Sequence, residues 1–242
     1  MVLRAQSGTS PLAGEVGRGG AQGLMAGLAI AFALVLTLLA PATAAEEILT
    51  YDVAVVLAPD ASAEVTETIT ANVEGRQILR GLLRYLPKSI VGDDASIREV
   101  TNTVLSATRD GAPEPYAVED LRGQIVVRIG KVDVFLAHKV HTWELRYRIS
   151  ALAGPSGSNN ALAYEAIGMN WPFPIRKVSL TVTLPPGSRV VKPVARIGTV
   201  VGDLAGTWTN VSPTKLSFAP VKPVGDDASL SIVILFTGGL TP

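Results

Sequence analysis

The sequence predicts a mostly β protein whose fold is an antiparallel β-sandwich, immunoglobulin-like in architecture, preceded by an N-terminal hydrophobic signal helix. Three observations lead to this prediction. Apolar and polar residues alternate with a period of two along much of the chain, which is typical of strands with one buried face. Clusters of Gly and Pro separate these stretches in the way that turns do. One long apolar run precedes the first alternating stretch.

The composition excludes several classes of protein. The 242 residues include 21 Lys+Arg and 21 Asp+Glu, so the chain lacks the basic excess that nucleic-acid binding usually shows. It contains no cysteine, which excludes disulfide scaffolds and Cys-ligated zinc or iron–sulfur sites. Motifs for a nucleotide cofactor are also missing from the sequence. We therefore expect no nucleic-acid partner, no cofactor and no metal ion.

The N-terminal part of the chain predicts export from the cytoplasm. Residues 1–24 are glycine-rich without apolar periodicity, so we expect disorder or a start codon assigned too far upstream. Residues 25–44 combine an apolar run with a small-residue exit, as a signal peptide does. Its cleavage leaves residues 45–242 as an extracytoplasmic domain, periplasmic or secreted. Two alternatives stay open, in which Met25 to Ala45 is retained as a membrane anchor or forms a core helix.

The alternating stretches give the positions of the strands. Residues 49–57 and 63–73 flank a turn at 59–62, and they predict a hairpin with one buried face. Further strands are expected at 125–129, 140–149, 178–184 and 230–236. The last of these is apolar on both faces, so we expect a central strand covered on both sides. The strand at 140–149 has on its predicted buried face His141, Trp143, Leu145, Tyr147 and Ile149.

One segment does not follow the alternation. Its cations Arg76, Arg80, Arg84 and Lys88 recur every four residues beside an apolar stripe at helical spacing. The segment predicts either a short helix that ends at Pro87 or an extended basic loop. The four cations are a candidate interaction site for an anionic lipid or polymer, with a simple solvated face as the alternative.

Two polar residues on apolar faces are candidate buried groups. Glu67 is a lone carboxylate on the apolar face of its strand, and we expect Arg128 or Arg146 to pair with it. A perturbed acid in a cleft is the functional alternative for this residue. We expect His141 to be packed and hydrogen-bonded rather than a general base. On a strand it also points away from His138, so the two histidines cannot share a metal ion.

Three other patterns have a structural and a functional interpretation. The segment Val91–Ile97 recurs at Val224–Leu230, and it favours two Gly-Asp turns over calcium loops because the spaced ligands are missing. The segment at 154–158 resembles a nucleophile elbow only superficially. Core packing is favoured over a sugar-stacking platform for Trp143, Trp171 and Trp208. No catalytic residue is therefore assigned.

Several motifs occur in combination along residues 46–240. They are DASAEVTETI at 60–69, RGLLRYLP at 80–87, Asp110-Gly111 followed by Pro115-Tyr116, and NWPFPI at 170–175. In this combination the chain resembles the N-terminal domain of the YciQ-like family of predicted membrane proteins, domain of unknown function 2207. The resemblance implies an extracytoplasmic β-rich domain in a family without an established activity. Members usually continue into transmembrane helices, whereas this chain ends at Pro242.

We therefore expect a non-enzymatic module of the cell envelope that contacts an unidentified envelope protein or polymer. The period-two core and the missing catalytic motifs favour this function. The alternative is an envelope polysaccharide-acting hydrolase or sugar-binding module that uses clustered carboxylates and aromatics. In that case Glu67 or Glu165 would be the acidic group in a cleft.

Overall fold

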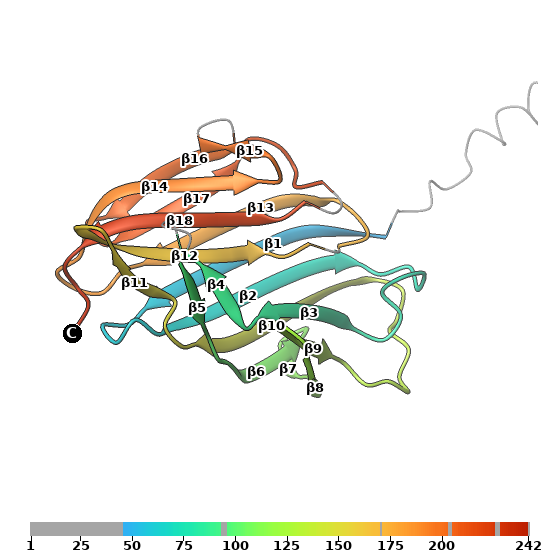
Figure 1. Cartoon of the computed structure of the whole chain (residues 1–242). Helices are drawn as coiled ribbons and strands as arrows, with labels where there is room; N and C mark the ends of the chain where they lie inside the picture. Colours follow the sequence, from blue (N-terminus) through green and yellow to red (C-terminus); the bar gives the residue numbers. More distant parts are fainter. Residues whose placement is uncertain (1–45, 93–95, 170, 203–204, 226–227, 242) are drawn as a thin grey trace, which may run out of the picture. The chain divides into compact units, whose positions relative to one another are not determined.

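The computed structural model describes residues 46–92, 96–169, 171–202, 205–225 and 228–241 (Figure 1). Within these ranges the protein is mostly β, with several antiparallel sheets and no helix, which confirms the predicted β class. All the described residues belong to one compact unit, Ala44–Pro242. No helix in the described part has the length and hydrophobicity that a membrane crossing requires.

Some sequence-based predictions concern residues outside these ranges. They include the disordered or mis-assigned start at 1–24 and the signal helix at 25–44. Part of each repeated Gly-Asp turn is also outside, at 93–95 and 226–227.

The largest sheet has eight strands, which come from the N-terminal, middle and C-terminal parts of the domain (Figure 1). Strands β1 and β13 are parallel, and every other neighbouring pair is antiparallel. In spatial order the strands are β16 (Gly206–Ser212), β17 (Lys215–Pro220), β13 (Ile175–Thr183), β1 (Glu47–Leu57), β2 (Ala63–Asn72), β10 (Val140–Ile149), β6 (Asn102–Arg109) and β7 (Ala112–Pro113).

Three smaller sheets complete the described part, and their buried side chains join those of the large sheet in a single hydrophobic cluster. The five-stranded sheet has the order β11 (Ala153–Ser156), β12 (Asn159–Ile167), β18 (Leu230–Thr237), β14 (Arg189–Ile197) and β15 (Val200–Val201). The three-stranded sheet consists of β3 (Leu82–Pro87), β9 (Gln124–Ile129) and β8 (Tyr116–Leu121). The two-stranded sheet pairs β4 (Ser89–Val91) with β5 (Ile97–Glu99).

The predicted first hairpin is confirmed as β1 and β2. Its turn is closed by the Asp60 carboxylate, which accepts hydrogen bonds from the Ser62 hydroxyl at 2.6 Å and the Ser62 N–H at 3.0 Å. These hydrogen bonds lower the pKa of Asp60. In the stretch at 49–57 the apolar residues occupy the odd positions, which predicts that Leu49 faces inward. This prediction is wrong, because a bulge between Ile48 and Thr50 shifts the register and buries Ile48 instead.

The predicted strand at 140–149 is confirmed as β10, with the predicted face inward. His141, Trp143 and Tyr147 are buried, while Arg146 and Arg148 on the opposite face are exposed. The predicted central strand at 230–236 is β18, which lies between β12 and β14. Its second face is only half-buried rather than covered, as the intermediate exposure of Val233 and Leu235 shows.

The segment 82–87 is neither the helix nor the loop that its spacing predicts. It is strand β3, which pairs with β9 and buries alternate residues. A helix is excluded by the preceding backbone, because Gly81 has a φ of +134° and a Cβ there would lie 1.8 Å from the Ile129 carbonyl oxygen. Gly130 is equally confined, since its Cβ would lie 2.1 Å from the Arg80 carbonyl oxygen. Gly81 and Gly130 therefore allow the loop before β3 and the loop after β9 to touch.

Candidate functional site

A fully buried carboxylate lies at the centre of the large sheet. Glu67 is in the middle of β2, opposite Val53 of β1 and Leu145 of β10, and its exposed fraction is 0%. Burying an ionised carboxylate is costly unless charged and hydrogen-bonding partners surround it. The partners of Glu67 come from three sheets, and together they form the Glu67 cluster: Glu67, Arg84, Tyr51, Tyr147 and Tyr164.

Strand register explains how two tyrosines reach this carboxylate. Tyr51 pairs with Ile69, and Tyr147 pairs with Val65, so each tyrosine is a diagonal neighbour of Glu67 on the inward face. The Tyr51 hydroxyl donates to Glu67 Oε2 at 2.6 Å, and the Tyr147 hydroxyl donates to Oε1 at 2.5 Å. Both carboxylate oxygens thus have a neutral donor from within the same sheet.

The other two members of the cluster come from the other sheets. Arg84 of β3 donates through Nε to both oxygens of Glu67, at 2.9 and 3.0 Å. Tyr164 of β12 lies with its hydroxyl 2.7 Å from that of Tyr147 and 3.4 Å from Glu67 Oε1. The Glu67 cluster therefore connects the eight-, three- and five-stranded sheets through polar contacts inside the core.

The guanidinium of Arg84 uses its remaining nitrogens on backbone carbonyls. Its Nη1 donates to the Tyr85 carbonyl at 2.8 Å, and its Nη2 donates to the Ala166 carbonyl at 3.4 Å. Gly168 leaves room for it, because a Cβ there would lie 2.9 Å from Nη1. Each of the three guanidinium nitrogens therefore donates to a protein oxygen, as expected for a buried cation.

Two sequence-based expectations for these residues are wrong. Arg84 is 3% exposed, so it belongs to the core and not to a basic surface with Arg76 and Arg80, both of which are exposed. The predicted partners of Glu67 lie at the surface instead, where Arg128 bonds Glu119 and Arg146 bonds Glu64. The fourth predicted cation, Lys88, bonds Asp120.

The electrostatics of the Glu67 cluster keep its tyrosines neutral. Burial raises the pKa of Tyr51 and of Tyr147 well above the usual range, and the negative charge of Glu67 acts in the same direction. The pKa of Tyr164 is raised for the same two reasons. Burial opposes the charge of Arg84, but the attraction of Glu67 outweighs it and holds the pKa of Arg84 above its usual range. The three tyrosines therefore stay neutral beside the Arg84–Glu67 ion pair.

The second candidate buried group, His141, lies at the beginning of β10. It is 1% exposed, and its Nδ1 lies 2.7 Å from Asp110 Oδ2 while its Nε2 lies 3.0 Å from the Ala137 carbonyl oxygen. Asp110 also accepts from the Thr142 N–H at 3.0 Å. Burial raises the pKa of Asp110, but the hydrogen bonds from Thr142 and His141 outweigh it, so that the pKa is lowered. These contacts hold the β6–β7 turn against β10.

The tryptophans do not form a common platform. Trp143 is fully buried, and Trp171 is 7% exposed with its ring edge-on to that of Tyr51 at 5.6 Å. Trp208 packs on Phe218, with 5.0 Å between the ring centroids. The alternative acid, Glu165, is partly buried, which raises its pKa, and the positive charge of Arg84 opposes this shift.

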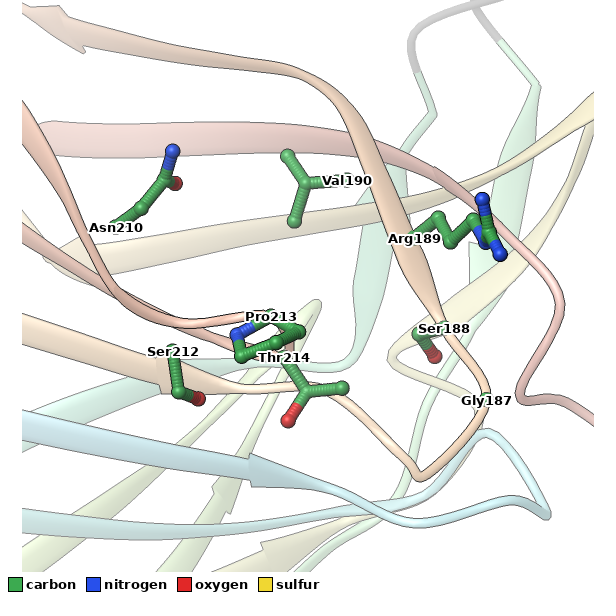
Figure 2. Close-up of a pocket in the computed structure, with 8 residues that line it drawn as sticks. All are labelled: Gly187, Ser188, Arg189, Val190, Asn210, Ser212, Pro213 and Thr214. Atoms are coloured by element: carbon green, nitrogen blue, oxygen red, sulfur yellow. The ribbon is translucent and has the colours of Figure 1, made fainter.

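Sequence patterns gave no indication of a large cavity in the described part of the chain. It measures about 690 Å³ and lies between the β13–β14 turn and the β16–β17 hairpin (Figure 2). Its polar character comes mostly from hydroxyl groups, and the buried Ser188 Oγ has no hydrogen-bond partner among the described residues. Glu67 does not line it. The lining residues are Gly187, Ser188, Arg189, Val190, Asn210, Ser212, Pro213 and Thr214 (Figure 2).

The segment at 154–158 lies in a strand–turn–strand context. It covers the end of β11 and the turn into β12, where Gly157 has a φ of +56°. A nucleophile elbow requires a strand-to-helix turn. Among the described residues no group of three or more His, Asp or Glu side chains is placed to hold a metal ion.

Comparison with known structures finds distant similarities. Yeast LTA4 hydrolase is 10% identical, with a TM-score of 0.49, over 79% of this chain and 29% of that chain. An M1 zinc metallopeptidase from Deinococcus radiodurans is 13% identical, with a TM-score of 0.40, over 77% of this chain and 42% of that chain. At these scores the similarity has no bearing on the function of this chain.

Comparison of sequences is more informative. The uncharacterized protein YciQ of Escherichia coli strain K12 is 25% identical over 165 residues, which are 68% of this chain and 26% of that protein. The chain thus spans about a quarter of the length of this relative. Residues 47–231 match the model of the family described as "Predicted membrane protein (DUF2207) N-terminal domain". These residues include most of the described strands and the whole Glu67 cluster, so the chain belongs to the DUF2207 family of predicted membrane proteins.

Proposed function

We propose that residues 45–242 are a non-catalytic, extracytoplasmic module of the cell envelope, with an immunoglobulin-like sandwich architecture, that acts through surface contacts with protein or polymer. The observation that carries this proposal is the closure of the Glu67 cluster. A general acid or base must reach a substrate proton, directly or through one water molecule. Glu67 is inaccessible and both of its oxygens accept hydrogen bonds from protein donors, so this buried ion pair is suited to stabilising the fold rather than to catalysis.

Placement outside the cytoplasm is supported by two observations. Residues 25–44 have the apolar run and the small-residue exit of a signal peptide. The family to which the chain belongs is described as a family of predicted membrane proteins. A folded module behind such a segment is exposed to envelope proteins and polymers, which makes them the expected partners.

The test combines binding and turnover on the purified full chain. The protein is incubated with envelope polysaccharides and peptidoglycan, and bound protein and newly formed reducing ends are measured in the same samples. We expect binding without new reducing ends, for the wild type and for Glu165→Gln alike. New reducing ends that Glu165→Gln abolishes would contradict the proposal and favour the hydrolase alternative.

A further inference from the structure

Two loops meet at one end of the large sheet (Figure 1). They are the β2–β3 loop, residues 73–81, and the β9–β10 loop, residues 130–139. The Val73 N–H donates to the Lys139 carbonyl at 3.1 Å, and the Leu136 N–H donates to the Leu79 carbonyl at 2.9 Å. The close approach at Gly81 and Gly130 joins the loops at their other end. They therefore form one continuous surface.

This surface carries exposed apolar side chains between cations. Phe135 is 64% exposed, Val132 is 59% exposed and Leu83, at the adjoining start of β3, is 46% exposed. A cavity of about 290 Å³ opens beside Leu83 and Val132, and Leu79 and Arg80 also line it. Exposed apolar side chains gathered in this way mark a surface that contacts a protein, a ligand or a membrane. We call it the loop face, and it consists of Leu79, Leu83, Val132, Val134 and Phe135 with Arg76, Arg80 and Lys131.

The charge of the two loops favours an anionic partner. They contain four Lys and Arg against two acidic residues, Glu74 and Asp133, which gives a net charge of +2. Within the described residues Arg76, Arg80 and Lys131 form no ion pair, so they are available to negatively charged groups. The Arg80 guanidinium carbon lies 4.3 Å from the ring centroid of Phe135, which places a cation beside the most exposed aromatic ring of this surface.

The position of the loop face along the chain indicates the kind of partner. The Glu46 carboxylate accepts from the Gln77 N–H at 2.6 Å and the Glu74 N–H at 3.1 Å, so the entry of the chain is fixed to the β2–β3 loop. The apolar run ends at Leu39, seven residues earlier, a distance of at most about 25 Å along an extended chain. Both a signal peptide and an anchor enter a membrane. While the apolar segment is in the membrane, this short connection therefore keeps the loop face near the bilayer surface.

From these observations we propose that the loop face docks on the surface of an anionic lipid bilayer. Phe135, Val132 and Leu83 enter the headgroup region, and Arg76, Arg80 and Lys131 contact lipid phosphates. The proposal rests on the extracytoplasmic placement proposed above, and it is independent of whether the module has catalytic activity. The partner of the loop face is then a lipid surface rather than a protein.

The absence of cysteine from the chain allows a local test on the full-length protein. Val132→Cys is labelled with the environment-sensitive fluorophore NBD and mixed with vesicles of phosphatidylcholine containing about one third phosphatidylglycerol. Val211→Cys is the matched control, because Val211 is a similarly exposed valine (56%) on β16, away from the loop face. Both proteins carry the N-terminal apolar segment, so any tethering through it is the same in the two samples.

We expect NBD emission at position 132 to rise roughly twofold and shift to the blue, with quenching by brominated lipid, while position 211 stays unchanged. Adding Lys131→Gln should lower lipid contact at position 132 about fivefold, as expected for one cation near an anionic surface. Three outcomes would overturn the proposal: no change at position 132, equal changes at both positions, or a change at 132 that depends on protein concentration without vesicles. The last would assign the loop face to a second copy of the chain.

Discussion

Arg84 Nε lies 2.9 Å from Glu67 Oε2 and 3.0 Å from Oε1, so one N–H is shared between both oxygens of a carboxylate in the core. This contact brings β3 of the three-stranded sheet to the centre of the eight-stranded sheet. The charges are removed from water, and only their mutual attraction and the surrounding hydrogen bonds offset the cost of desolvation. We therefore expect the Glu67 cluster to act as a stabilising network.

The tyrosine hydroxyls should contribute measurably to stability. Tyr147→Phe removes the donor to Glu67 Oε1 and the contact with Tyr164, and we expect it to lower the free energy of unfolding by about 1.5–3 kcal/mol. Tyr116→Phe is the control, because Tyr116 is 41% exposed, and a loss within about 0.5 kcal/mol is expected. Urea denaturation measures both. Equal losses would mean that the hydroxyl of Tyr147 is not part of a stabilising network.

Stability should fall at alkaline pH. Tyr51, Tyr147 and Tyr164 have a raised pKa in the folded state, so the unfolded state loses its tyrosine protons first as the pH rises above about 10. Their contribution is complete below that pH and is lost above it, by about 1.4 kcal/mol per pH unit for each tyrosine. Unfolding free energies measured from pH 9 upward, to about pH 11, should fall less steeply in Tyr147→Phe than in the wild type. An unchanged slope in that variant would contradict the raised pKa.

The inward register of β10 predicts unequal losses on its two faces. Trp143→Ala should cost about 3–5 kcal/mol, because Trp143 is fully buried and its removal leaves a cavity. Arg148→Ala should cost about 0.5 kcal/mol, because its side chain lies at the surface and bonds Ser62 and Asp60 there. Chemical denaturation of the two variants is the measurement. A loss for Arg148→Ala as large as that for Trp143→Ala would mean that the register is wrong.

The sequence predicts strands where apolar residues dominate one face over a long stretch, so that a single polar residue such as Glu67 or His141 does not hide the alternation. This is the reason why β10 is predicted with its correct bounds and orientation, and β2 with its turn at Asp60. Strand β3 fails this criterion, because an arginine occupies the buried position between Leu82 and Leu86. If Arg84 is assigned to a polar face, the apolar residues of this segment lie at helical spacing. The pattern L-x-R-x-L, with the arginine treated as inward, would have predicted the strand.

In the Glu67 cluster, the sequence predicts the buried carboxylate but not its cationic partner. Glu67 stands out as a carboxylate on an apolar face, and such a residue is expected to have a cationic partner. The identity of that partner depends on how separate sheets stack, and local alternation contains no information about this. Arg84 reaches Glu67 from another sheet, as Tyr164 does, while the predicted partner Arg146 lies on the outer face of β10.

The most direct test of the account is a double-mutant cycle on Glu67 and Arg84 in the full chain, measured as the free energy of unfolding in urea. Arg84→Met and Glu67→Gln each leave one buried group without its partner, and each should cost about 3–5 kcal/mol. The double variant removes both charges, so we expect its loss to be smaller than the sum of the single losses by about 2–3 kcal/mol. Additive losses, or a loss below about 1 kcal/mol for Arg84→Met, would contradict a stabilising ion pair at the centre of the domain.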